Sequence, residues 1–68
     1  MIIKITEWCF TKEEAQSKAT QWWNERFEEY SSEGYIYFDM SFQTDYLRKM
    51  LGKKCYRVKI TGVPSYIV

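Results

Sequence analysis

The segment from Thr11 to Gly34 constrains the fold most, because it has the pattern of one long amphipathic helix in a chain of 68 residues. Thr11, followed three residues later by Glu14, has the form of a capping box at a helix N-terminus, and a glycine such as Gly34 commonly ends a helix. At about 100° per residue, the apolar side chains fall within about 140° of arc; they are Ala15, Ala19, Trp22, Trp23, Phe27 and Tyr30. We predict a helix that is capped by Thr11 and runs to about Ser32, with this stripe facing the core.

Three other segments alternate between apolar and polar residues, as half-buried strands do. In residues 2–8, Ile3 and Ile5 share one face, and the other face holds Lys4, Thr6 and Trp8. Residues 35–43 form two faces, one with Ile36, Phe38, Met40 and Phe42, the other with Tyr35, Tyr37, Asp39, Ser41 and Gln43. Residues 54–61 form the third predicted strand, in which Tyr56, Val58 and Ile60 lie opposite Cys55, Arg57 and Lys59.

Two shorter segments leave alternatives. In residues 44–52, Thr44 caps a short helix through Leu47 and Leu51 that ends at Gly52, or the segment is a wide hairpin connection. The tail, residues 65–68, is a candidate for a short additional edge strand.

The predicted order of elements is β-α-β-β. Because a long helix joins the first two strands, we expect these strands to be parallel with a right-handed crossover, and the third strand to run antiparallel to the second. One helix covers one face of a sheet. The sequence therefore predicts a single α+β domain over residues 1–68, a two-layer sandwich with one long helix on one face of a small mixed sheet. That sheet has three strands, or four with the tail.

The residue types present restrict the chemistry. The chain has no histidine, which removes the commonest general base and metal ligand. Its two cysteines, Cys9 and Cys55, cannot form a structural zinc site alone, and Gly-rich phosphate loops are missing. We expect no enzyme activity, no cofactor and no metal.

The same sequence features bear on the compartment. No apolar run is long enough for a signal peptide or a membrane span, so we expect a cytoplasmic protein without membrane contact. We expect both cysteines to be reduced and buried. The alternative, a Cys9–Cys55 disulfide, requires the first and last strands to be neighbours.

The formal net charge of +1 hides a separation of charge along the chain. Residues 46–60 contain no acidic residue and six basic ones, Arg48, Lys49, Lys53, Lys54, Arg57 and Lys59. The predicted helix is acidic, with Glu25, Glu28 and Glu29 near its C-terminal end, where carboxylates are unfavourable by about 0.3–1 kcal/mol each. These three glutamates form either a solvated face or a docking surface for a basic partner. Arg26 falls within the apolar stripe, so it either packs its stem on Trp22 or Tyr30 with its head in water, or forms a buried ion pair.

Aromatic and basic residues are interleaved on the sheet face that the helix leaves open. The candidates there are Trp8, Tyr35, Tyr37, Arg57 and Lys59. This composition suits a protein interface, an ordinary solvent face with cross-strand pairs, or a single-stranded nucleic acid site with Lys53 and Lys54 on phosphates. The chain lacks RNP and KH motifs and has a small net charge, which disfavours a dedicated nucleic-acid binder.

The first functional hypothesis is a small cytosolic protein–protein interaction module, a non-enzymatic inhibitor or regulator that binds a larger macromolecular machine. In size and element order the chain resembles the small proteins by which phages block host polymerases or defence systems, and this likeness implies the same mode of action. The alternative is single-stranded RNA or DNA binding through the open sheet face. A third hypothesis is a homodimer formed through the sheet face or an unpaired strand edge.

Overall fold

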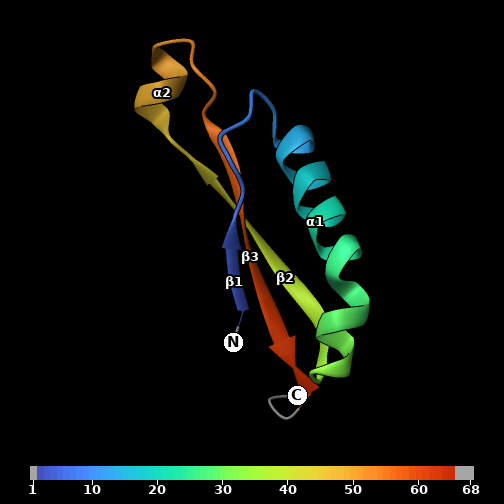
Figure 1. Cartoon of the computed structure of the whole chain (residues 1–68). Helices are drawn as coiled ribbons and strands as arrows, with labels where there is room; N and C mark the ends of the chain where they lie inside the picture. Colours follow the sequence, from blue (N-terminus) through green and yellow to red (C-terminus); the bar gives the residue numbers. More distant parts are fainter. Residues whose placement is uncertain (1, 66–68) are drawn as a thin grey trace.

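A computed structural model describes residues 2–65 and shows a small α+β fold with one long helix beside a three-stranded sheet (Figure 1). The elements in chain order are β1 (Ile2–Ile5), α1 (Lys12–Ser32), β2 (Tyr35–Thr44), α2 (Tyr46–Met50) and β3 (Tyr56–Pro64). The three predicted strands and the long helix are therefore present, but β1 ends at Ile5 rather than at residue 8, so Trp8 lies in the loop after it and not in a strand. The predicted strand in the tail falls largely outside the described residues. None of the helices within residues 2–65 is both long and apolar enough to cross a membrane.

The sheet has the order β1-β3-β2 and is antiparallel throughout. The strands β1 and β2 point the same way, as expected, but the prediction of a mixed sheet is wrong because β3 lies between them. The inward side chains of β3 explain its central place: Val58 and Ile60 are fully buried, and a central strand is the one that can bury such residues completely.

The ends of α1 follow from the predicted capping residues. The Oγ1 of Thr11 accepts a hydrogen bond of 3.0 Å from the backbone N–H of Glu14, and Gly34 after the helix has a φ of 98°, a conformation that favours glycine. The carboxylate of Glu14 lies 3.9 Å from Lys18, as expected for an i,i+4 pair. The predicted helix is confirmed.

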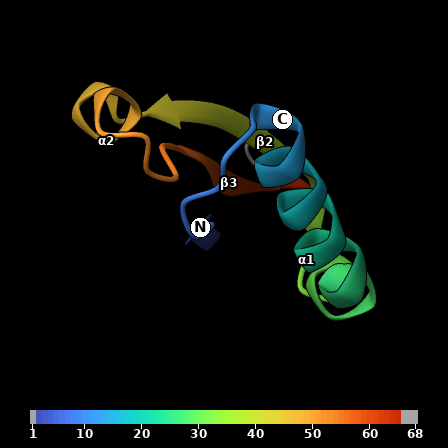
Figure 2. The same ribbon diagram turned by 90° about the horizontal axis from the view of Figure 1, so that it is seen from above.

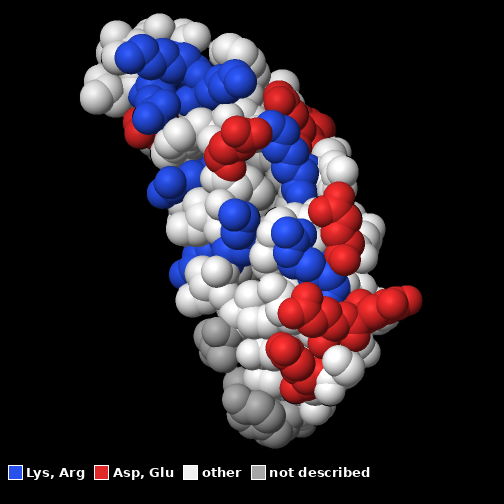
Figure 3. All heavy atoms as spheres, in the orientation of Figure 1, with Lys and Arg blue, Asp and Glu red and all other residues white. Residues whose placement is uncertain are grey.

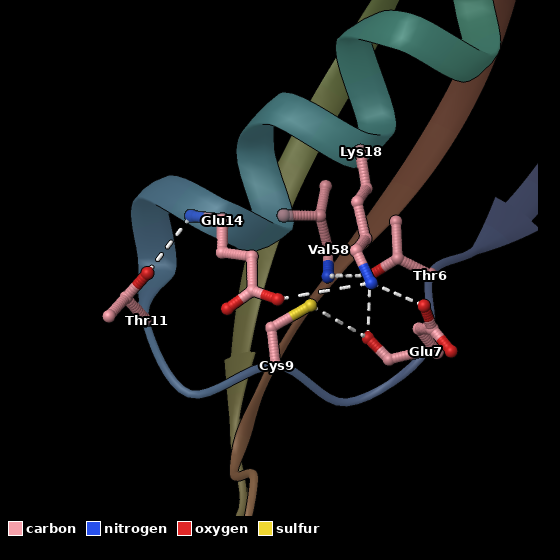
Figure 4. A network of polar contacts seen from close by, with 7 residues as sticks. All are labelled: Thr6, Glu7, Cys9, Thr11, Glu14, Lys18 and Val58. Atoms are coloured by element: carbon pink, nitrogen blue, oxygen red, sulfur yellow. Dashed lines mark hydrogen bonds and ion pairs between the residues drawn. The ribbon is translucent and has the colours of Figure 1, made fainter.

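The loop between β1 and α1 is held by polar contacts from both sides (Figure 4). The backbone N–H of Thr6 donates to Val58 O, and the backbone N–H of Val58 donates to Thr6 Oγ1, both at 2.9 Å. Lys18 of α1 forms an ion pair with Glu7 of the loop. The backbone N–H of Cys55 donates to Cys9 O at 3.0 Å, so the segments that carry the two cysteines are neighbours, and both thiols are free and buried.

The core lies between α1 and β3. Ala15, Ala19 and Trp23 of the helix are buried with Val58 and Ile60, and the Trp23 ring lies 5.0 Å from that of Phe38 in β2. The two alanines let the helix approach β3 closely. The prediction that Phe27 lies in the core is wrong, since this side chain is 49% exposed. Phe27 is exposed because it lies at the margin of the apolar stripe.

A bulge in β2 changes which residues face α1. The register shifts between Tyr35 and Tyr37, so an extra residue interrupts the alternation of side chains. Tyr35 consequently packs on the core, with its ring 6.0 Å from that of Tyr30, whereas Ile36 is exposed. The predictions that Tyr35 lies on the open sheet face and Ile36 on the core face are wrong for this reason.

The strand β1 also presents the opposite face from the one expected. Lys4 is paired with the buried Ile60 and so shares the helix-facing side of the sheet, whereas Ile3 and Ile5 are paired with Thr61 and Lys59 on the open side. Alternation alone does not say which face of a strand is covered. Pairing with β3 decides it here.

Candidate functional site

The connection between β2 and β3 forms a projecting end of the molecule, which we call the tip (residues 45–54). Of the two interpretations of residues 44–52, the short helix is correct: α2 spans Tyr46–Met50. The residue that caps this helix is Asp45, one residue after the predicted Thr44. The Oδ1 of Asp45 accepts a 3.1 Å hydrogen bond from the backbone N–H of Arg48. Figure 2 shows α2 extending from the sheet away from α1.

The tip exposes apolar side chains. The exposed fractions are 73% for Tyr46, 66% for Leu47, 80% for Met50 and 60% for Leu51. No residue of α2 is buried, so this helix adds no described residue to the core. Four large apolar side chains within six residues are therefore left to solvent in this structure, a pattern that is typical of binding surfaces.

Basic residues accompany these apolar side chains in the tip. Arg48, Lys49, Lys53 and Lys54 belong to the tip, and Figure 3 shows basic side chains gathered over that end of the molecule. Lys49 lies 5.8 Å from the ring centre of Tyr56, and interaction with the Tyr56 hydroxyl raises the pKa of Lys49. Lys54 lies over the ring of Phe10 at 5.5 Å. The tip thus combines exposed apolar side chains with four basic residues.

Trp8 joins the tip to the open face of the sheet. Its ring is contacted by two guanidinium groups, that of Arg48 at 5.0 Å and that of Arg57 at 4.3 Å. The Nε of Arg57 also donates a 2.7 Å hydrogen bond to Gln43 Oε1. These contacts orient Arg57 and occupy part of the indole surface with the chain's own cations.

The structure does not bring the predicted sheet-face residues together as one site. Arg57 is paired with Gln43, Lys59 with Ser41, and Tyr37 with Val63. Tyr37 is therefore six positions along β2 from Gln43, about 20 Å at about 3.4 Å per residue. Trp8 and Arg57 lie near the tip, Tyr37 lies near the opposite end, and Tyr35 faces the helix.

Five of the nine acidic residues lie on α1, and acidic side chains are most concentrated towards its C-terminal end (Figure 3). Glu25, Glu28 and Glu29 are all exposed, as predicted. Glu25 accepts a 3.2 Å hydrogen bond from Gln21 and lies 3.5 Å from Arg26. The guanidinium of Arg26, rather than its stem, lies on Trp22, 4.7 Å from the ring centre, and donates a 3.1 Å hydrogen bond to Trp22 O.

The exposed residues of α2 are the functional candidates that sequence reasoning missed. The signal was present, since a connection between strands is usually polar and this one contains Tyr46, Leu47, Met50 and Leu51. Within residues 2–65, no group of three or more His, Cys, Asp or Glu side chains is placed to hold a metal ion. Comparison of the chain with protein-family models, curated proteins and solved structures finds no match.

Proposed function

We propose that this protein is a small, non-enzymatic protein-binding module and that the tip is its main contact surface. The observation that carries the proposal is the exposure of Tyr46, Leu47 and Met50 on a helix that buries none of its residues, together with that of its C-cap Leu51. Burying each large apolar side chain against a partner is worth about 1.5–3 kcal/mol before the costs of association. A short polar turn could connect β2 to β3 without this exposed apolar surface.

The basic residues of the tip indicate the chemistry of the partner. Residues 45–54 contain four basic residues, Arg48, Lys49, Lys53 and Lys54, and one acidic residue, the cap Asp45, which lies 3.6 Å from Arg48. A complementary surface is therefore an apolar pocket with acidic residues at its edge. By covering such a pocket on a larger protein, the chain would act as an inhibitor or regulator.

Site-specific photo-crosslinking tests this proposal. A photoreactive residue at Met50 should give a discrete adduct with one partner in cells, and the same residue at Gln16, on the outward surface of α1, should not. The double variant Leu47→Ser with Tyr46→Ser should remove the adduct without unfolding the protein, because neither residue is buried. An adduct from position 16 that matches the one from position 50, or an adduct that survives the double variant, would contradict a contact through the tip.

Single-stranded nucleic acid is a second candidate ligand, favoured by the four cations of the tip beside exposed aromatic rings. The two arginines on Trp8 leave less of that ring for a base, so Tyr46 is the better stacking platform. Binding of labelled single-stranded DNA and RNA should then weaken between about 50 and 200 mM salt, with a log–log slope near −0.7 per phosphate contact. Lys53→Ala with Lys54→Ala should reduce that slope, and Lys18→Ala is the control. Absence of binding at the lower salt would exclude this ligand.

A further inference from the structure

The outer edge of β2 lacks the usual protection of an edge strand. It is ten residues long, and within residues 2–65 it is paired with β3 alone. Natural edge strands are commonly short or carry lysine, proline or a bulge that blocks further pairing. β2 contains no lysine, arginine or proline and one charged residue, Asp39, and its bulge lies at the Tyr35 end. The opposite edge strand, β1, has only four residues and includes Lys4.

We propose that β2 pairs with β2 of a second copy of this chain, antiparallel about a two-fold axis normal to the sheet, to form one continuous six-stranded sheet. Closed two-fold dimers are the commonest homo-oligomers. Rotation about this axis does not exchange the two faces of the sheet, so both α1 helices lie on the same side of it. The proposal concerns the purified chain alone and does not depend on the proposed function of the tip.

The sequence of β2 favours one register. Directly opposed residues of antiparallel strands share a face, so a symmetric pairing must be centred on a residue. A centre at Asp39 would oppose two carboxylates, which is unfavourable. A centre at Met40 opposes Phe38 to Phe42 of the second copy on the helix side, and Asp39 to Ser41 of the second copy on the open side. Phe42, which is 45% exposed, would gain an aromatic neighbour in this register.

The charge distribution favours the antiparallel arrangement independently. The basic tip follows the C-terminal end of β2, and Glu28, Glu29 and Glu33 lie at the end of α1 that precedes the start of β2. Figure 3 shows these basic and acidic regions towards opposite ends of the molecule. Antiparallel pairing places the tip of each copy beside the acidic end of the other. Parallel pairing would place like charges together.

Two substitutions at Ser41 test the dimer. Each changes the stability of the dimer in one direction and the pairing with Lys59 inside the monomer in the other, so the two effects can be told apart. Ser41 is exposed and is paired with Lys59 inside the chain, and in the proposed register it faces Asp39 of the second copy. Ser41→Lys should tighten the dimer and Ser41→Asp should weaken it, each by about three- to tenfold for two charge pairs per dimer. Within the monomer, Ser41→Asp gains an attraction to Lys59 and Ser41→Lys gains a repulsion.

Sedimentation velocity from about 1 μM to about 1 mM protein measures the dissociation constants of the wild type and both variants. We expect a wild-type dimer in this range, and hydrogen-exchange protection of β2 amides that rises with concentration. A wild type that stays monomeric throughout would overturn the dimer, and variants that shift the dissociation constant in the same direction would overturn the register centred on Met40. If both variants weaken the dimer, a register centred on Ser41 would be indicated instead of Met40. Neither result bears on crosslinking of the tip to another protein.

Discussion

At the scale of single residues, one ion pair joins the loop after β1 to the long helix. The ammonium of Lys18 both donates a hydrogen bond to Glu7 and attracts its charge, which lowers the pKa of Glu7 and raises that of Lys18. Glu7 is largely exposed, so the pair is screened by salt and its contribution to stability is small. Its value lies in fixing the loop that carries the buried Cys9 and the partly buried Trp8.

The lowered pKa of Glu7 predicts a pH-dependent effect of Glu7→Gln. Because the pKa is lower in the folded chain than in the unfolded one, the ion pair stabilises the fold above the unfolded value of about 4.3, and this is lost as the pH falls through the folded value. Glu7→Gln should lower the free energy of unfolding slightly at pH 7 and leave it unchanged at about pH 2. Urea denaturation at both pH values measures this, with Glu28→Gln as the control for loss of a surface carboxylate. An equal loss at both pH values would show that the ion pair is not the cause.

At the scale of elements, predictions succeeded where a local pattern determined the structure. Thr11, the apolar stripe and Gly34 are sufficient to define α1, because caps and periodicity act within a few residues. Tyr35 was misplaced because a one-residue bulge reverses the alternation, and Lys4 because only the pairing of β1 with β3 decides its face. The same limit applies to the candidate site: the exposure of Leu47 and Met50 depends on where α2 lies relative to the core.

The close approach of β3 to the helix makes Gly62 sensitive to substitution. A Cβ atom at this position would lie 3.2 Å from Tyr35 Cδ1, 3.3 Å from Ile2 Cβ and 3.4 Å from Trp23 Cη2. We expect Gly62→Val to overpack this contact and lower the free energy of unfolding by about 1–3 kcal/mol. Thermal denaturation compared with Thr61→Val, on the open face of the same strand, measures the difference. Equal stabilities of the two variants would mean that the core can shift to accept the larger side chain.

The helix α2 should melt locally rather than with the whole molecule. Its cap, Asp45, bonds the backbone N–H of Arg48, and no residue of α2 is buried. We therefore expect Asp45→Ala to destabilise α2 by about 1 kcal/mol while leaving the global unfolding transition almost unchanged. Hydrogen exchange by NMR should show faster exchange confined to residues 46–52. A matching drop in the protection of β3 amides would show that α2 supports the core after all.

At the scale of the whole molecule, charge is distributed along an elongated body. The principal extents are 42, 21 and 13 Å, with the basic tip and the acidic end of α1 well apart (Figure 3). The acidic end is locally unfavourable, because Glu25 and Glu29 are like charges four residues apart and α1 has no basic residue in its last turn. Such a cost is retained either for binding or for solubility, and the two can be separated by substitution.

The substitution Glu29→Lys separates a role in binding from a role in solubility, because it should stabilise the folded chain. The change replaces a like-charge pair with a favourable pair between Glu25 and the introduced lysine, and it places a cation near the negative end of the helix, for a gain of about 0.5–1.5 kcal/mol. We expect urea denaturation to show this gain, and the crosslink from Met50 to persist, since the proposed contact lies at the tip. The gain should shrink at high salt, because both effects are electrostatic. Loss of the crosslink in a variant that is more stable than the wild type would instead assign partner binding to the acidic face of α1, with Glu25 and Glu28 as the next residues to reverse.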